Sequence, residues 1–306
     1  MDVRGAVKDS FGYLHSIDMV TLDYLLVGSY KTVTDHLIIL LEGHGMVKEK
    51  NTKLDNLPGF RYEYYTNYVW FEGFTFFLGK WSNYDKMDKS WYNLDMMRLK
   101  VNPNKHMGTE LMNDVLAFLG EWCRDGVLIR YDYAIDVPVP LSDVLVINSR
   151  KQKGLYKGTR YFGRRHSHGY LKIYDKAAEQ KLDGDLTRIE YTMVPDQIPS
   201  WDNIVIRAPV KDAPDEKLSK TLRLYLDMLV ELRELGADID QYIQRMDFKS
   251  FKKIEPYLMT GVRLEFDTEI NNCLLENICS VFIVTKNQQL VKDEFMECFD
   301  TDLPFD

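Results

Sequence analysis

The spacing of apolar residues changes from strand-like in the first two-thirds of the chain to helix-like beyond it. Between positions 61 and 80 aromatic side chains recur mostly on even positions, and Gly73 interrupts the run, which predicts a strand and a hairpin. The aromatic residues of this face are Tyr62, Tyr64, Tyr68, Trp70, Phe74 and Phe76. Further strands are expected at Met96–Val101, Val127–Val137, Tyr170–Tyr174 and Thr187–Met193.

Helical spacing appears once between these strands and then repeatedly after them. Thr109 is a typical N-cap for a helix that Asp125 and Gly126 would stop. Later helices are expected over 216–235, over 240–255 before Pro256, and over 268–283. Strands separated by a helix indicate the α+β class. We therefore expect an α+β domain over 1–200 and a helix-rich region over 201–306.

The composition limits the core size, the cellular compartment and the kinds of site to be expected. With 306 residues, 45% of them apolar, the chain can build one large or two ordinary hydrophobic cores. Its longest apolar run, Leu37–Leu41, is far too short to cross a membrane, and the first residues do not resemble a secretion signal. The four cysteines lack CxxC spacing, which argues against a zinc site. We expect a soluble, reduced, cytoplasmic protein with no membrane partner.

Positive charge is concentrated in one segment. The net charge is −8, yet the segment from Arg150 to Tyr174 has eight basic residues and no acidic one, which leaves −16 for the rest of the chain. An acidic protein with one uncompensated basic segment is expected to bind a polyanion there. The predicted DNA contacts are Arg150, Lys151, Lys153, Lys157, Arg160, Arg164, Arg165 and Lys172. The alternative is a solvated loop.

Period-two geometry gives three of the predicted strands a polar face. Tyr170, Lys172, Tyr174 and Lys176 share one side of their strand, and the other two strands present Arg130, Asp132 and Asp136, and Arg188 and Glu190. If these faces adjoin, a tyrosine hydroxyl, carboxylates and basic groups meet in one pocket. Carboxylate oxygens suit Mg²⁺ or Mn²⁺, and a phenol needs such help to attack a phosphodiester at neutral pH. The alternative is a set of cross-strand salt bridges on a solvated face.

Four blocks of sequence resemble the rolling-circle replication initiators of small staphylococcal plasmids, and more loosely the relaxases of integrative elements. Residues 97–105 resemble that family's MRIEFNPNK, and residues 130–136 resemble its RLDLAFD. Residues 159–165 and 172–179 are similar to its ETKYFGxR and RIYNKKQE, and residues 188–190 are similar to its RVE. The blocks occur in the family's order and cover about a third of the chain.

The resemblance implies a DNA-nicking domain of the HUH-like type, with mainly antiparallel strands. It implies that Tyr174 attacks one strand of a plasmid origin, forms a 5′-phosphotyrosine and frees a 3′-OH, and that the reverse reaction religates the strand. The basic residues expected to hold phosphate at the catalytic site are Arg188, Lys172 and Lys176. The expected ligands of Mg²⁺ or Mn²⁺ are Asp132 and Glu190, then Asp136 and Glu179. A homodimer and a host helicase are the expected protein partners.

Two features depart from the family pattern. Lys100 stands where the family block has Glu, which favours a rival interpretation of the chain as a non-catalytic, sequence-specific DNA-binding regulator of replication. His166-Ser167-His168 resembles the metal-binding His-hydrophobic-His of many rolling-circle nickases, but its middle residue is Ser. We expect these histidines to lie near DNA phosphates rather than to bind the metal.

Overall fold

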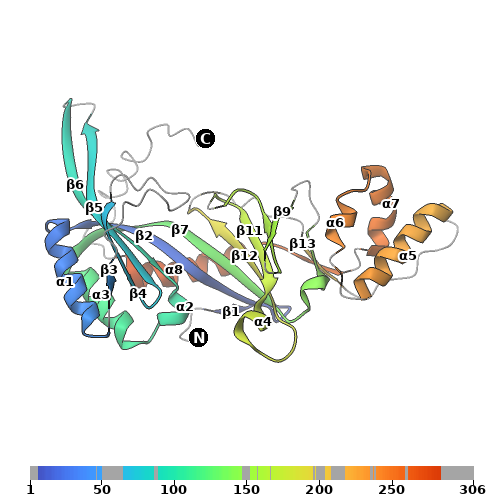
Figure 1. Cartoon of the computed structure of the whole chain (residues 1–306), viewed down its shortest axis with the longest axis horizontal. Coiled ribbons are helices and arrows are strands. Elements are labelled where there is room, and N and C mark those ends of the chain that lie inside the picture. The colour runs from blue at the N-terminus through green and yellow to red at the C-terminus, as the bar shows by residue number, and fades with distance from the viewer. Residues whose placement is uncertain are drawn as a thin grey trace.

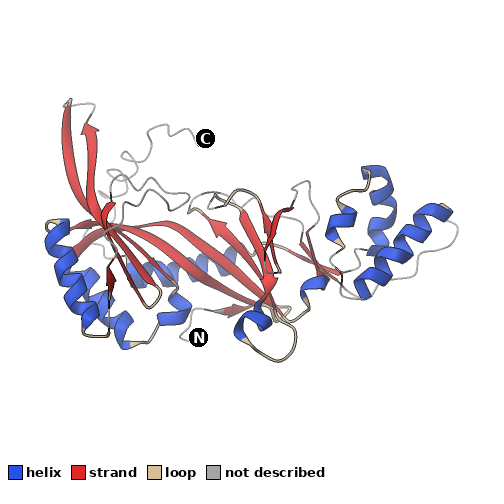
Figure 2. Ribbon diagram, viewed as in Figure 1, coloured by secondary structure: helices blue, strands red, loops and turns tan. Residues whose placement is uncertain are grey.

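The computed structural model describes residues 6–45, 47–49, 65–85, 89–146, 152–156, 158–165, 167–195, 197, 204–207, 218–234, 237, 239–258 and 261–283. Within them, one large antiparallel sheet runs through the molecule, with helices packed on one of its faces (Figure 1; Figure 2). The expected α+β class and mainly antiparallel strands are confirmed. No described helix has the length and apolar character needed to cross a membrane.

The large sheet has the strand order β3-β4-β5-β6-β2-β7-β12-β11-β10-β9, with β1 paired to β2. Its strands are β1 (Val7–Lys8), β2 (Leu14–Leu26), β3 (Lys48–Glu49), β4 (Tyr65–Phe71), β5 (Phe74–Asp85), β6 (Ser90–Val101), β7 (Cys123–Val137), β9 (Gln152–Tyr156), β10 (Thr159–Phe162), β11 (Tyr170–Asp175) and β12 (Thr187–Met193). The two longest strands, β2 and β7, pair along the middle and join its two halves.

Three helices cover the apolar face of this sheet: α1 (Tyr30–Glu42), α3 (Glu110–Trp122) and α8 (Thr268–Phe282). The predicted cap of α3 is confirmed, because the Thr109 side chain accepts a hydrogen bond from the Met112 N–H. Tyr133 and Ile135 of β7 lie fully buried on this face. Removal of this much apolar and aromatic surface from water is the main driving force for the fold.

The β4–β5 hairpin corrects one expectation about faces. Glu72 and Gly73 both have positive φ, 46° and 94°, which makes the two-residue turn that suits a twisted hairpin. The turn reverses the alternation, so the residues that enter the large core are odd in β4 and even in β5, although Phe77 is buried as well. Phe74 and Phe76 are therefore in the core as expected, whereas Trp70 is 38% exposed. Tyr62 and Tyr64 fall outside the described residues.

The helix-rich region contributes to two separate cores. The helices α5 (Lys220–Glu234), α6 (Asp240–Ile243) and α7 (Phe248–Leu258) pack around Leu229 and Ile254 and lie at the right-hand end of Figure 1. In contrast, α8 packs beneath β2 and β7, with the Tyr24 hydroxyl donating to the Phe282 carbonyl at 2.9 Å. The expected interruption at Pro256 is wrong, since α7 continues through it to Leu258.

A small second sheet crosses the predicted domain boundary near residue 200. It has the order β14-β13-β8, from β14 (Gly261–Leu264), β13 (Ile204–Arg207) and β8 (Val144–Val146). Two short α-helices, α2 (Pro103–His106) and α4 (Lys176–Gln180), follow β6 and β11, and a 3-10 helix, η2 (Leu141–Asp143), precedes β8. Division of the chain at 200 stays a prediction, and contacts across that position are extensive.

Candidate active site

The three strands expected to share a polar face are neighbours in the sheet. In the register of β11, β12 and β7, Tyr174 lies opposite Arg188, which lies opposite Asp136. Lys172 lies opposite Glu190 in the same ladder. Because alternate residues point to the same face, these side chains project together on the side away from α8. The sequence therefore predicted this cluster correctly, and its members are held by regular strands rather than by loops.

Tyr174 is half-buried near the end of β11. Its hydroxyl donates to Glu190 Oε2 across 3.4 Å, and Lys176 Nζ lies 5.7 Å from the centre of its ring. Burial, and then the Glu190 carboxylate, raise the pKa of Tyr174 well above the ordinary value of a phenol. Formation of the nucleophilic phenolate here requires positive charge from a ligand or a change in its surroundings.

Glu190 and Asp132 face the same ammonium group. Lys172 Nζ forms an ion pair with Glu190 Oε1 and lies 3.8 Å from Asp132 Oδ2. Burial raises the pKa of Glu190 to about 7, against the lowering effect of Lys172. For Lys172, burial lowers the pKa, but Glu190 and Asp132 outweigh it and raise the pKa overall. The two carboxylates thus define a position for a cation, which Lys172 fills.

Arg188 forms the most extensively bonded ion pair of the site. Its Nε and Nη2 donate to the two oxygens of Asp136 at 2.6 and 2.7 Å, and its Nη1 donates to Asp18 Oδ1 at 2.8 Å. Asp18 also accepts from Asn102 Nδ2 at 3.0 Å. Planar guanidinium suits such bidentate pairing with a carboxylate. Arg188 and Asp136, predicted as a phosphate contact and a metal ligand, are thereby joined to each other.

Asp18 is a site residue that the sequence interpretation missed. The pairing of β2 with β7 shifts between Ile17 and Met19, and this bulge makes Asp18 the extra residue, turned to the same face as Asp136. The signal was an acidic residue within the apolar alternation of positions 14–26, a segment for which no strand was predicted.

The remaining predicted residues are spread more widely. Glu179 lies on α4 with a 53% exposed side chain, paired to Lys176 at 2.5 Å, away from Asp132 and Glu190. Arg160 is only 2% exposed and donates to the carbonyls of Leu141 and Val144, so its predicted contact with DNA is corrected to a structural role. Arg160 is buried because even positions of β10 face the core.

Of the other predicted DNA contacts, two are exposed and the side chains of the rest fall outside the described residues. Arg164 and Arg165 are exposed in the turn between β10 and β11. Arg150, Lys151 and Lys157 fall outside the described residues, as does the side chain of Lys153. His166 is also outside, whereas His168 Nδ1 accepts from the Val194 N–H at 3.1 Å. Within the described chain no three His, Cys, Asp or Glu residues cluster as a metal-binding group.

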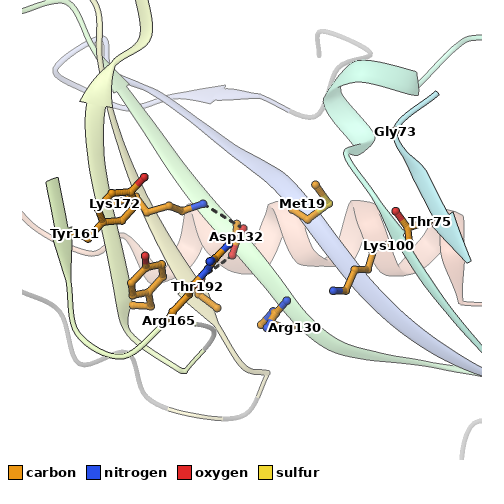
Figure 3. A pocket seen from close by; sticks show the side chains of 11 residues that line it. Met19, Gly73, Thr75, Lys100, Arg130, Asp132, Tyr161, Arg165, Lys172 and Thr192 are labelled. Carbon is orange, nitrogen blue, oxygen red and sulfur yellow. Dashed lines mark hydrogen bonds and ion pairs between the residues drawn. The ribbon is translucent and has the colours of Figure 1, made fainter. Parts of the chain in front are cut away.

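A cavity of about 640 Å³ opens beside this cluster (Figure 3). Lys172 and Asp132 line one side of it, and Lys100 and Arg130 line another. Lys100, the residue that departs from the family pattern, thus lies on the same face as the predicted site. Burial, then Arg130 and Arg98, lower the pKa of Lys100 to about 7.

Lys100→Met is therefore expected to stabilise the fold below neutral pH. The unfolded lysine has a pKa of 10.5 and the folded one about 7, so the unfolded chain binds more protons between these values. The loss of folding free energy caused by burying charged Lys100 is complete below pH 7 and disappears as pH rises toward 10.5. Urea unfolding at pH 6.5 should show a gain of about 1–3 kcal/mol, discounted for relaxation. Exposed Lys80, changed to Met, is the control; equal gains in both variants would contradict this account.

Comparison with known proteins agrees with the four motifs. No family model matches the chain. A replication initiation protein of Staphylococcus aureus is 27% identical over 198 residues, which are 58% of this chain and 61% of that protein. A second replication initiation protein of the same organism is 27% identical over 137 residues, 39% of this chain and 42% of its own length. The matches therefore span less than two-thirds of these relatives.

A solved structure of a rolling circle replication initiator protein from Geobacillus stearothermophilus aligns with 91% of this chain and all of its own. The two chains are 13% identical, and the TM-score is 0.33. The sequence matches define the class: the chain is a relative of replication initiation proteins, as its motifs predicted. The named relatives come from Staphylococcus aureus.

Proposed function

We propose that this chain is a replication initiator that nicks one strand of origin DNA through Tyr174 and later religates it. The observation that carries the proposal is the position of the Tyr174 hydroxyl, 3.4 Å from Glu190 Oε2 and close to the cation position that Glu190 shares with Asp132. A phenol, a carboxylate acceptor and basic groups on adjacent strands are the parts that a phosphodiester transfer needs. The sequence relatives support the replication role.

In the proposed reaction, Tyr174 Oη attacks the scissile phosphorus while its proton passes to Glu190. The new Tyr–O–P bond forms as the bond from phosphorus to the 3′ oxygen breaks, and that oxygen takes up a proton to become a 3′-OH. The number of phosphoester bonds is unchanged, so attack by a 3′-OH on the phosphotyrosine can reseal the strand. Lys172 and Lys176 are the proposed phosphate contacts, because both ammonium groups lie beside Tyr174 or Glu190.

Arg188 is proposed as a positioning residue. Three of its nitrogens already donate to carboxylates, and these bonds connect β12 with β7 and β2 beside Tyr174. A guanidinium held on three sides by Asp136 and Asp18 fixes the strands that carry the nucleophile and Glu190. This arrangement supports orientation of the reacting groups over direct contact with the phosphate.

The predicted Mg²⁺ or Mn²⁺ fits the donor set of Asp132 and Glu190. Both are hard oxygen donors that face the Lys172 ammonium, so a metal bound there would take the place of that ammonium and leave Lys172 to the substrate phosphate. Mg²⁺ commonly binds proteins through one or two carboxylates together with water and substrate phosphate. When bound, the metal would neutralise charge on the scissile phosphate. Asp136 is a poorer ligand, since Arg188 occupies both of its oxygens, and Glu179 is directed to Lys176.

Metal removal gives a direct test of this cofactor. A chelator should stop nicking, and added Mg²⁺ or Mn²⁺ should restore it. Asp132→Asn should reduce cleavage by about a hundredfold or more while DNA affinity changes little, because the second carboxylate alone holds the metal weakly. Glu179→Gln is the matched control and should retain activity. Full activity of Asp132→Asn in the chelator would rule out the proposed cofactor.

The wider role is also proposed from the relatives and the resemblance. The substrate is double-stranded origin DNA nicked as an exposed single strand, the protein acts in the cytoplasm as a homodimer, and a host helicase extends the opening. Supercoiled plasmid carrying the DNA that adjoins this gene tests the role. The protein should convert it to the nicked form and remain attached to one end. Tight binding without nicking would favour the non-catalytic regulator.

A further inference from the structure

The cavity beside the candidate site has a strongly positive lining. Lys100, Arg130, Arg165 and Lys172 contribute four cationic side chains, whereas Asp132 is the one acidic residue that lines it within the described chain. They come from β6, β7, the turn after β10, and β11, so the charge is assembled from segments far apart in the sequence. The chain has a net charge of −8, yet these four cations repel one another at one place. Clusters of like charge that destabilise a fold are often functional sites.

The repulsion between cations is clearest around Lys100. Its neighbours on its own strand and on β7 include the cations Arg98 and Arg130, and the carboxylates of Asp23 and Asp132 partly offset their effect. Asp23 already holds Arg98 in a bidentate pair with both contacts at 2.6 Å. Like charges held together in a partly buried cavity disfavour one another unless an anion enters. Arginine and lysine together are the residues that proteins use for phosphate.

The cavity also has an aromatic wall. Tyr161 and Tyr170, on β10 and β11, line it, and their rings are stacked with centroids 6.2 Å apart and an interplanar angle of 14°. Tyr161 is half-buried, so part of its ring borders the open cavity. Aromatic rings beside a basic groove are typical of sites for unpaired nucleotides, because any base can stack on them. A metal ion or a free phosphate would need no such wall.

The position of the cavity relative to Tyr174 sets the part of the substrate that could enter it. Lys172 lines the cavity and is two residues from Tyr174, which places the near side of the cavity about 7 Å from the nucleophile. Lys100 lies four strand positions away, on β6, or about 19 Å across the sheet. A strand cut at Tyr174 could therefore continue over the cavity for several nucleotides.

We propose that this cavity binds the unpaired DNA strand that flanks the cut, with backbone phosphate against Lys100, Arg130 and Arg165 and a base against Tyr161. This deepens the proposed function and rests on it. Lys100 then has a positive role: where the relatives' motif has a carboxylate, this chain has a phosphate contact. The phosphate contacts hold the strand in place, whereas origin sequence is read elsewhere.

The test measures binding of a short fluorescent oligothymidylate to protein that carries Tyr174→Phe, so that no cutting complicates the result. Lys100→Gln and Arg130→Gln should each weaken binding about five- to tenfold. Each should also make the dependence of log K on log salt shallower by about 0.7, the value for one phosphate of a single strand. Lys100→Arg keeps the charge and should keep most of the affinity. Exposed Lys80→Gln, on neighbouring β5, should leave both quantities unchanged.

A second probe tests the aromatic wall. An abasic oligonucleotide of equal length should bind the parent protein more weakly than oligothymidylate, and Tyr161→Ala should remove that difference. Thermal unfolding checks that each variant is folded. Unchanged affinity and salt slope in folded Lys100→Gln and Arg130→Gln would overturn the proposal. Because no covalent step is measured, that outcome leaves nicking by Tyr174 standing, and a failure to nick leaves this binding result standing.

Discussion

Tyr174→Phe is expected to abolish the covalent protein–DNA adduct while origin affinity stays within about twofold. The substitution removes only the hydroxyl, and the ring keeps its place over β11 beside Lys176. Loss of the attacking atom leaves no route to the phosphotyrosine, so the fall in cleavage should reach the detection limit, about four orders of magnitude or more. Denaturing gels of protein mixed with labelled origin strand measure the adduct, and a gel shift measures affinity.

Tyr170→Phe provides the matched control for this experiment. Tyr170 lies four residues earlier on the same face of β11, and its hydroxyl is likewise removed without loss of the ring. Its adduct should form at nearly the parent rate. An adduct that survives in Tyr174→Phe and disappears in Tyr170→Phe would move the nucleophile to the cavity and contradict the assignment made here.

Asp136→Ala is expected to destabilise the fold by about 3–5 kcal/mol, because it leaves the Arg188 guanidinium largely buried without its bidentate partner. Glu179→Ala, at another acidic residue predicted from sequence as a metal ligand, should cost less than about 1 kcal/mol, since its side chain is 53% exposed. Chemical unfolding of both variants measures the difference. This contrast separates a carboxylate that holds strands together from one that lies at the surface.

The opposite results would change the account of the site. If Asp136→Ala unfolds like the parent but loses metal-stimulated cleavage, Asp136 is a ligand and its pairing with Arg188 is incidental. If Asp136→Ala is too unstable to isolate, Asp136→Asn retains one acceptor for Arg188 and should show a smaller loss in the same direction.

The central cluster could be predicted from sequence because period two fixes which side chains share a face. Within each strand, alternation places Lys172 with Tyr174, Arg188 with Glu190, and Asp132 with Asp136. The sequence could not show that the three polar faces adjoin; this follows from the pairing of β11, β12 and β7. Tyr133 and Ile135 lie on the opposite face of β7 and are buried in the core.

The predictions that were wrong, and the site residue that was missed, depend on tertiary contacts. Asp18 reaches the site through a bulge against β7, and a bulge is set by pairing with a distant strand. Arg160 was predicted to contact DNA together with its basic neighbours. Alternation within β10 instead directs its side chain into the core, where it donates to two backbone carbonyls. Pro256 was expected to interrupt a helix, yet α7 continues through it to Leu258. The missing N–H removes one hydrogen bond, and only two residues of the helix follow it.

The cavity also could not be predicted from the sequence alone. Lys100 and Arg130 occur in separate motifs thirty positions apart, and each reads as an ordinary charged residue of a strand. Their convergence with Arg165 results from the order β6-β2-β7-β12-β11-β10. Lys100 therefore looked like a lost carboxylate in the sequence, and in the structure it belongs to a basic surface.

The most direct measurement of the central claim is to map the attachment site of DNA on the protein. The chain is mixed with single-stranded DNA from the region that adjoins its gene, the complex is digested with protease and nuclease, and the peptides are sequenced by mass spectrometry. We expect a nucleotide joined through phosphate to the hydroxyl of Tyr174. An adduct on another residue, or origin DNA bound tightly with no adduct on any peptide, would contradict it.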